Sequence, residues 1–294
     1  VLPPDMNGFE VLSQMAHQNW IEDIPVIMIS SEDSNAIVRR AYELGASDYI
    51  SRPFDAHIVY RRVTNTIRLY AKQRRLSTMV AQQFYEREKN NRMMINILSQ
   101  VVEQRNGESG LHVRHVQVLT DILLDRLTQK TDRYQVSRAE RSLINTAAAL
   151  HDIGKITIDD KILNKPGRFT DEEFAIMKSH SAIGSQMLLD LPEEQLASPL
   201  ISVANAICRW HHERYDGRGY PDGLVGEEIP ISAQVVSLAD VYDALTSERS
   251  YKKAFSHEKA LSMIIEGQCG TFNPLLLQCL TEASDELAAM KGIG

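Results

Sequence analysis

Cysteine is scarce in this sequence of 294 residues, with only Cys208, Cys269 and Cys279. Their unrelated spacings give neither a disulfide framework nor a zinc-knuckle pattern. Free thiols of this kind suit a reducing compartment, so we expect a cytoplasmic protein. The sequence also lacks an apolar run close to the length that spans a bilayer, and its first residues do not form a signal peptide. We therefore expect no membrane partner.

The sequence also has fewer positively charged residues than negatively charged ones. Lys and Arg total 32 against 39 Asp and Glu, for a net charge of −7. This balance disfavours non-specific binding to nucleic acid, and we expect no nucleic-acid partner. An anionic substrate would need cations or metal ions gathered at one place. Hydrophobic content of 43% and charged content of 24% are those of an ordinary globular protein, and the length suggests two domains.

Residues 1–70 alternate between strand and helix patterns. The β-branched run at residues 24–30 predicts a buried strand, and residues 33–44 have helical spacing that stops at Gly45. Residues 47–50 predict a second strand, and another helix is expected from Asp55. Strands and helices in alternation indicate a parallel α/β sheet.

These segments resemble the second half of a response-regulator receiver domain. Residues 4–10 are similar to the loop after the phosphorylated strand, Ser30 to the switch hydroxyl, and residues 45–54 to the last strand and its Pro. The resemblance implies a partial, flavodoxin-like receiver, with a sensor histidine kinase as partner of the full-length protein. The aligned phospho-acceptor falls at or just before the first residue, so Asp5 is not that residue, and Arg52 replaces the family's Lys. We do not expect this chain itself to be phosphorylated.

Residues 71–102 are the expected helical linker between two domains. Residues 55–102 lack Gly and Pro, and their apolar residues recur at imperfect heptad spacing. The pattern predicts one long helix or two. Two interpretations stay open for this segment: a coiled coil that forms a homodimer, and helices packed within one chain.

Residues 103–294 predict a second domain that is nearly all α. Thr170 and Glu173 fit a capping box that opens a helix. Asn273 and Pro274 are expected to open the last helix, which runs to about Met290. Helical periodicity also predicts helices over residues 111–127, 137–150, 200–212, 231–246 and 256–267.

The pair His151 and Asp152, followed by Gly154 and Lys155, stands where a helix is expected to give way to a loop. An imidazole nitrogen and a carboxylate oxygen on adjacent residues can bind one metal ion or bridge two. Alone, such a pair is more often a helix cap or an ion pair, and a lone His such as His180 is more often a core residue. The wider pattern favours metal, because four separate helices each offer His or Asp at comparable depth.

The candidate ligands outnumber those that one ion needs. They are Glu108, His112, His151, Asp152, His180, His211, His212 and Asp240. Imidazole and carboxylate without thiolate suit Fe or Mn best, with Zn, Ni and Co as alternatives. We expect two divalent ions, with three as the alternative.

Beyond residue 103 the sequence resembles the HD-GYP family, a branch of the HD phosphohydrolases, over roughly residues 108–274. The resemblance rests on His151-Asp152 with Lys155, on Lys165-Pro166-Gly167, on His180, on residues 211–221 with Gly219-Tyr220-Pro221, and on residues 240–252. It implies an all-α HD-type helical bundle, joined to the receiver by the long helix. It also implies a metal-dependent phosphodiesterase that opens cyclic di-GMP to pGpG, with further hydrolysis to GMP left open, as the output of a two-component response regulator.

The resemblance also implies roles by position. The eight candidate ligands would hold the ions, with Asp152 as the bridge and with Glu108 and His112 serving a third ion. The implied catalytic residues are His151, Asp152 and Lys155. The implied substrate-binding residues are Lys155, Arg249, Lys252 and Tyr220. The loop around Tyr220 is also implied to bind a partner protein, and its ring is expected either to stack on guanine or to fill a packing gap.

Two other functions compete with hydrolysis of cyclic di-GMP. The first is a sensor that binds the dinucleotide with little turnover, and the complete ligand set argues against it. The second is an HD hydrolase of another nucleotide, and the Gly-Tyr-Pro loop with Arg249 and Lys252 argues against it. The sequence departs from the family at Arg114-His115, where an Arg is usual three residues after the first His, and at Asn273, where Asp is usual. Both departures are peripheral to the ligands.

Overall fold

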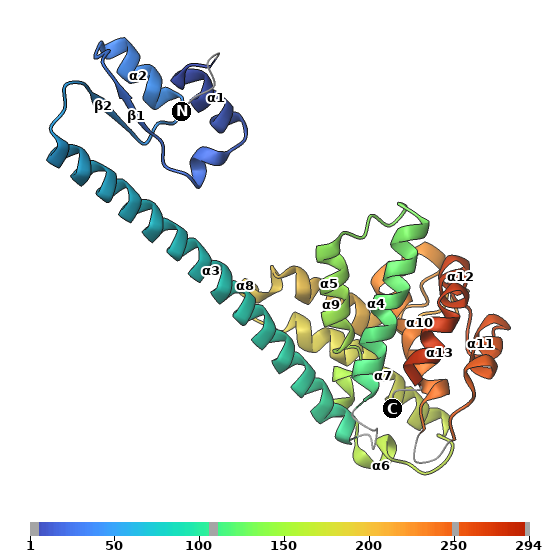
Figure 1. The fold of residues 1–294 in the computed structure, drawn as a ribbon. Helices are drawn as coiled ribbons and strands as arrows, with labels where there is room; N and C mark the ends of the chain where they lie inside the picture. The colour runs from blue at the N-terminus through green and yellow to red at the C-terminus, as the bar shows by residue number, and fades with distance from the viewer. Residues whose placement is uncertain (1–5, 106–110, 249–252, 292–294) are drawn as a thin grey trace. The chain divides into compact units, whose positions relative to one another are not determined.

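The computed structural model describes residues 6–105, 111–248 and 253–291. The chain divides into two compact units, Val1–Lys89 and Asn90–Gly294 (Figure 1). Three predicted site residues, Glu108, Arg249 and Lys252, lie outside the described residues. Within the described ranges, no helix combines the length and the apolar character that crossing a bilayer requires.

The first unit contains a parallel pair of strands, β1 (Ile27–Ser30) and β2 (Asp48–Ser51). The elements around them are α1 (Gly8–His17), the 3-10 helix η1 (Trp20–Glu22) and α2 (Asn35–Glu43), which connects the strands. A core forms from Leu12, Ala41, Ala46 and Tyr49. The predicted α/β receiver fold is confirmed. β1 begins at Ile27 rather than at residue 24, since Pro25 has no N–H to donate to a strand ladder.

One helix of 50 residues, α3 (Ala56–Arg105), follows the sheet. The sequence left one helix or two open, and the structure has one, because no Gly or Pro interrupts it. Within the first unit, the Arg62 guanidinium binds Asp48, and the hydroxyls of Tyr70 and Ser47 lie 3.0 Å apart. The exposed apolar side chains of the helix include Leu76, Met79, Val80, Phe84, Met94 and Leu98. The coiled-coil interpretation of residues 71–102 stays a prediction.

All regular elements described in the second unit are helical, which confirms the predicted all-α bundle. The α-helices are α4 (His112–Lys130), α5 (Arg138–Ala148), α6 (Asp160–Leu163), α7 (Asp171–Leu189), α8 (Glu193–Leu196), α9 (Pro199–Trp210), α10 (Ile231–Thr246), α11 (His257–Ile265), α12 (Pro274–Glu282) and α13 (Ser284–Lys291). The 3-10 helices are η2 (Ile153–Thr157) and η3 (Gly226–Glu228).

α10 lies at the centre of this bundle and packs against α4, α9 and α11. Val235, Val236, Leu238 and Tyr242 are each at most 1% exposed. A helix that is buried all round has no solvent-facing side, so any polar side chain on it must find partners inside the protein. This placement brings the carboxylates of α10 into the interior.

The prediction of one last helix, from Asn273 to about Met290, is wrong in one respect. The structure has two helices in this range, α12 and α13. The backbone turns at Ala283, where φ is −85° and ψ is 2°. Ala283 is buried, and the hydroxyl of Ser284 lies 2.8 Å from Nε2 of His257. These tertiary contacts favour the turn, and local helical propensity alone cannot reveal them.

Candidate metal centre

The first part of the site forms where the backbone of η2 lies against the backbone of α7. Asp152 is the N-cap of η2, in the short turn that follows the end of α5 at Ala148. A Cβ atom on Gly154 would lie 1.9 Å from the carbonyl oxygen of His180 and 2.6 Å from the amide nitrogen of Gly184. Only glycine permits η2 to lie so near α7. The approach brings the carboxylate of Asp152 to the imidazole of His180.

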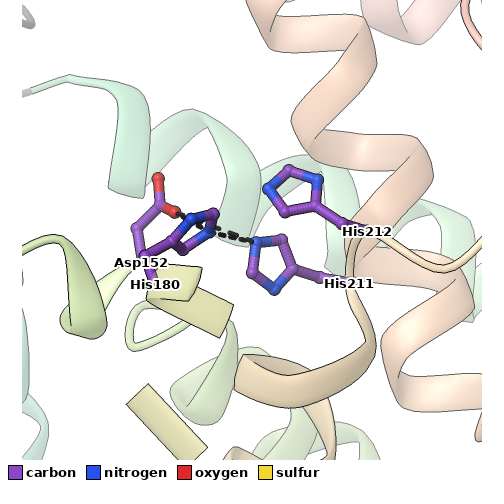
Figure 2. Close-up of side chains that lie close together, drawn as sticks. All are labelled: Asp152, His180, His211 and His212. Carbon is purple, nitrogen blue, oxygen red and sulfur yellow. Dashed lines mark hydrogen bonds and ion pairs between the residues drawn. The ribbon is translucent and has the colours of Figure 1, made fainter. Parts of the chain in front are cut away.

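The first ligand group consists of Asp152, His180, His211 and His212, whose side chains point toward one another (Figure 2). One ligand atom from each residue lies within 4.8 Å of those of the others. His180 comes from α7, and the two adjacent His follow the end of α9. The side chains of His180 and His211 are buried. Three separate segments of the chain therefore converge on this group.

The second ligand group consists of His112 from α4, His151 and Asp240 from α10, again with ligand atoms within 4.8 Å. Nε2 of His112 lies 3.4 Å from Nε2 of His151 and 3.4 Å from Oδ1 of Asp240. Oδ2 of Asp152 lies 3.3 Å from Nε2 of His151. Asp152 thus contacts both groups, which is the position that a bridging ligand requires.

Backbone carbonyl groups fix the orientation of three imidazoles. The Nδ1 to oxygen distances are 2.8 Å for His151 to Ala148, 2.7 Å for His180 to Met177 and 2.9 Å for His211 to Ile207. A carbonyl only accepts, so Nδ1 carries the hydrogen, and Nε2 of a neutral ring presents a lone pair. The Nε2 atoms of His180 and His211 face each other at 3.4 Å. Two lone pairs at this distance repel each other unless a cation lies between them.

Burial and neighbouring charges shift the pKa values of the imidazoles in opposite directions. Burial, with the charges of neighbouring His, lowers the pKa of His211 to about 3 and holds the pKa of His212 well below its ordinary value. Burial also lowers the pKa of His151, but the charges of Asp152 and Asp240 outweigh burial and raise it to about 9. Without metal, a proton on His151 provides part of the positive charge that these carboxylates demand. A metal cation can take the place of that proton.

Asp152 carries the strongest sign of a cation site. Its Oδ1 atom is buried with no hydrogen-bond partner in the described part of the chain, 3.2 Å from Nε2 of His180. Nζ of Lys155 lies 2.5 Å from Oδ2. Burial alone would raise the pKa of Asp152, but Lys155 and His151 hold it well below its usual range. An ionised oxygen facing imidazole lone pairs needs a cation, so the donors fit a divalent metal ion.

The loop after α9 is tied down by Glu213, whose side chain is buried. Its carboxylate accepts hydrogen bonds from the backbone N–H groups of Asp222 at 2.7 Å, Gly223 at 3.0 Å and Leu224 at 3.1 Å. Gly219 lies against the same turn, because a Cβ atom there would lie 2.4 Å from Cα of Glu213. One side chain therefore satisfies three backbone donors of the loop.

Tyr220, in this loop, lies beside the first ligand group. Its ring is 4.8 Å from the ring of His212, with 31° between the two planes. Nζ of Lys178 lies 5.8 Å from the centre of the Tyr220 ring. Burial, with the charges of Asp152 and Asp240, raises the pKa of the phenol, so the hydroxyl stays neutral. The ring covers an imidazole at the rim of the site and remains partly exposed.

Replacing Glu213 with alanine is expected to loosen this loop. Three N–H groups would lose their acceptor, and the free energy of unfolding should fall by about 2–4 kcal/mol. Urea unfolding measures the loss, and limited proteolysis locates it in the loop. Glu266→Ala is the control, because that exposed carboxylate accepts hydrogen bonds from the neighbouring Ser262 and Gln268 and not from a backbone N–H of the loop. Equal stability of the two variants would show that Glu213 does not organise the loop.

The structure brings the predicted site residues together wherever it describes them. Seven of the eight candidate ligands belong to the two groups, and Lys155 lies beside Asp152. The eighth, Glu108, and the predicted phosphate contacts Arg249 and Lys252 lie outside the described residues. The roles of all these residues as ligands or substrate contacts stay predictions.

One buried residue of the site was missed from the sequence. Asp243 is 1% exposed, and its carboxylate lies 2.7 Å from Nδ1 of His112 and 2.9 Å from Nδ1 of His115. Burial would raise its pKa, but hydrogen bonds from both His hold that pKa well below the usual range. The signal was its spacing, since Asp243 lies three residues after Asp240 and one helical turn brings both to the same face.

Comparison with known proteins identifies two families in the chain. The HD domain model matches residues 92–274, more than half of the chain, and the response regulator receiver domain model matches residues 2–64. A Vibrio cholerae protein named probable cyclic di-GMP phosphodiesterase is 36% identical over 94% of this chain and 65% of its own length. The Xanthomonas campestris cyclic di-GMP phosphodiesterase response regulator RpfG is 33% identical over 98% of this chain and 75% of its own length.

A further relative from Vibrio cholerae is named 3'3'-cGAMP-specific phosphodiesterase 2. It is 36% identical over 70% of this chain and 37% of its own length. The chain thus spans between about a third and three quarters of these relatives, and 65% of the first. Identity of this extent across both parts, together with the model matches, shows the family. The chain belongs to the HD domain family, and its HD domain follows part of a response regulator receiver domain.

Proposed function

We propose that this chain is a metal-dependent phosphodiesterase that hydrolyses cyclic di-GMP to pGpG, with further hydrolysis to GMP as the alternative, as the output of a two-component response regulator. The observation that carries the proposal is the convergence of seven imidazole and carboxylate ligands in two adjoining groups. The names of two relatives, which match nearly all of this chain, support cyclic di-GMP as the substrate.

The two groups are proposed to hold two divalent ions, with Asp152 between them. Three ions are the alternative, in which Glu108 and His112 would serve the third. Fe and Mn suit the mixture of imidazole and carboxylate best, with Ni, Co and Zn as alternatives. When bound, such ions neutralise the charge of a phosphodiester and lower the pKa of water, so that a nucleophile exists at neutral pH.

The chain's own residues hold and orient the substrate in this proposal. Lys155, fixed against Asp152 by a 2.5 Å contact, places a positive charge beside the first ligand group, where a phosphate oxygen would lie. Arg249 and Lys252 are proposed to contact the phosphates as well. The partly exposed ring of Tyr220 is proposed to stack on a guanine base. In this proposal the three cationic side chains neutralise the phosphates, whereas Tyr220 recognises the base.

Several partners belong to the same proposal. A sensor histidine kinase would phosphorylate the receiver of the full-length protein. The exposed apolar side chains of α3 would pair with a second copy and form a homodimer, as the heptad spacing suggests. The loop that carries Tyr220 would bind a partner protein. The proposed location is the cytoplasm, in keeping with three free cysteines.

The test is turnover of cyclic di-GMP by protein reconstituted anaerobically with Fe(II) or Mn(II), with bound metal counted in the same sample. We expect pGpG or GMP from metal-loaded protein and none from chelator-treated protein. Chromatography resolves the two products and tells whether hydrolysis stops at pGpG. No product from a fully loaded site would favour the alternative of a cyclic di-GMP sensor with little turnover.

A second substrate is worth measuring because one relative is named for 3'3'-cGAMP. This relative supports the alternative of an HD hydrolase that acts on another nucleotide. Parallel assays with cyclic di-GMP, 3'3'-cGAMP and cyclic di-AMP would rank kcat/KM for the three dinucleotides. A higher value for 3'3'-cGAMP would replace the proposed substrate while leaving the metal-dependent reaction in place.

A further inference from the structure

We propose that Asp243 is a positioning residue that holds His112 in the tautomer with hydrogen on Nδ1, so that Nε2 is available as a ligand. The inference rests on the proposed metal centre, but it does not depend on which dinucleotide is the substrate. Asp243 itself would not touch the ion, because its carboxylate lies on the Nδ1 side of the ring.

His112 differs from the other buried imidazoles in how its ring is held. In His151, His180 and His211, Nδ1 donates to a carbonyl of the helical turn before it. His112 is the first residue of α4, and among the described residues the acceptor beside its Nδ1 is a carboxylate. Oδ2 of Asp243 lies 2.7 Å from this nitrogen.

Three donors surround the carboxylate of Asp243. His112 donates to Oδ2, while Nδ1 of His115 lies 2.9 Å from Oδ1 and the hydroxyl of Ser247 donates to Oδ1 at 2.7 Å. The residue is 1% exposed, so these bonds replace its hydration. An ionised carboxylate accepts at both oxygens and cannot donate, which forces the hydrogen of His112 onto Nδ1.

The opposite end of the ring is then directed into the site. Nε2 of His112 lies 3.4 Å from Nε2 of His151 and 3.4 Å from Oδ1 of Asp240. α10 carries both carboxylates, one helical turn apart, so that Asp240 approaches Nε2 while Asp243 approaches Nδ1. The helix therefore provides one proposed ligand and fixes the orientation of another.

An amide in place of this carboxylate tests the idea with little change of shape. Asp243→Asn keeps one acceptor oxygen, which the two donors His115 and Ser247 would hold on their side. An NH₂ group that cannot accept would then face His112, which can turn its ring or move its hydrogen to Nε2. Either change removes the lone pair from the second ligand group. We expect the affinity for one ion to fall about 10–100-fold, as is usual for residues that orient a metal ligand. The first ligand group, which does not contact Asp243, should keep its ion.

The experiment measures Mn(II) binding by calorimetry and elemental analysis on the whole chain. Wild type is compared with Asp243→Asn and with Asp190→Asn, a control at an exposed position. ¹⁵N NMR of the histidine rings in metal-free protein reports the tautomer of His112, assigned with His112→Gln. We expect hydrogen on Nδ1 in wild type and weaker binding of one ion in Asp243→Asn alone.

The outcomes separate this inference from the proposed function. Wild type that binds no Mn(II) would overturn both. Wild type that binds two ions, with an Asp243→Asn variant that binds both equally well, would overturn the positioning role alone. If Asp243→Asn fails to fold, the wild-type spectrum still decides, because hydrogen on Nε2 of His112 contradicts the inference.

Discussion

Asp152→Ala is expected to bind neither ion of the proposed pair and to hydrolyse cyclic di-GMP about 1000-fold more slowly than wild type, or slower still. Asp152 is the residue that contacts both ligand groups, with Oδ1 3.2 Å from Nε2 of His180 and Oδ2 3.3 Å from Nε2 of His151. Its removal also leaves Lys155 without the carboxylate that fixes its ammonium group. Elemental analysis and a product assay on one sample measure both losses.

Asp171→Ala provides the matched control for this variant. Asp171 is exposed in the first turn of α7, the helix that carries His180. Its loss should leave metal content and turnover unchanged, within the small effect of a surface substitution. Full metal content in Asp152→Ala would remove Asp152 from the proposed ligands, whatever happened to the rate.

Gly154→Ala is expected to have the second largest effect, although the residue has no side chain to bind anything. The new Cβ atom would lie 1.9 Å from the carbonyl oxygen of His180, so η2 and α7 must separate. Overpacking against rigid backbone should lower the free energy of unfolding by about 3 kcal/mol. Because Asp152 and His180 lie on opposite sides of this approach, metal binding should fall in the same variant.

Gly8→Ala tests whether a methyl group on any helical glycine has this effect. Among the described residues, a Cβ atom on Gly8 would meet the side chain of Met28, at the ordinary distance of 3.6 Å. Alanine is the better helix former, so this variant should be as stable as wild type or slightly more stable. A Gly154→Ala chain with normal metal content and a normal unfolding curve would falsify the view that this approach builds the site.

Local patterns predicted most of the elements in the second unit. Thr170 and Glu173 form the expected reciprocal capping box, with the Thr170 amide donating to Glu173 at 2.7 Å. The helix expected over residues 231–246 has those bounds in the structure. Both signals are local, since a cap involves residues three apart and apolar periodicity is a property of one segment.

Local sequence patterns do not reveal contacts between segments far apart in the chain. The turn at Ala283 depends on a contact between Ser284 and His257. The role of Asp243 depends on two His from another helix, 131 and 128 positions away. Composition and spacing identified the candidate ligands, but they could not say which Nε2 atoms face each other. That information lies in the packing of the helices.

The seven described candidate ligands come from five places in the chain: α4, the junction of α5 and η2, α7, the end of α9, and α10. Ions held by the two ligand groups would act as cross-links between segments far apart in sequence. At a free concentration 100 times its dissociation constant, such an ion stabilises the folded chain by about 2.7 kcal/mol. In a metal-starved cell, this protein would then unfold more often and be degraded faster. Metal supply would therefore set how much of this protein a cell contains, as well as the rate of the proposed reaction.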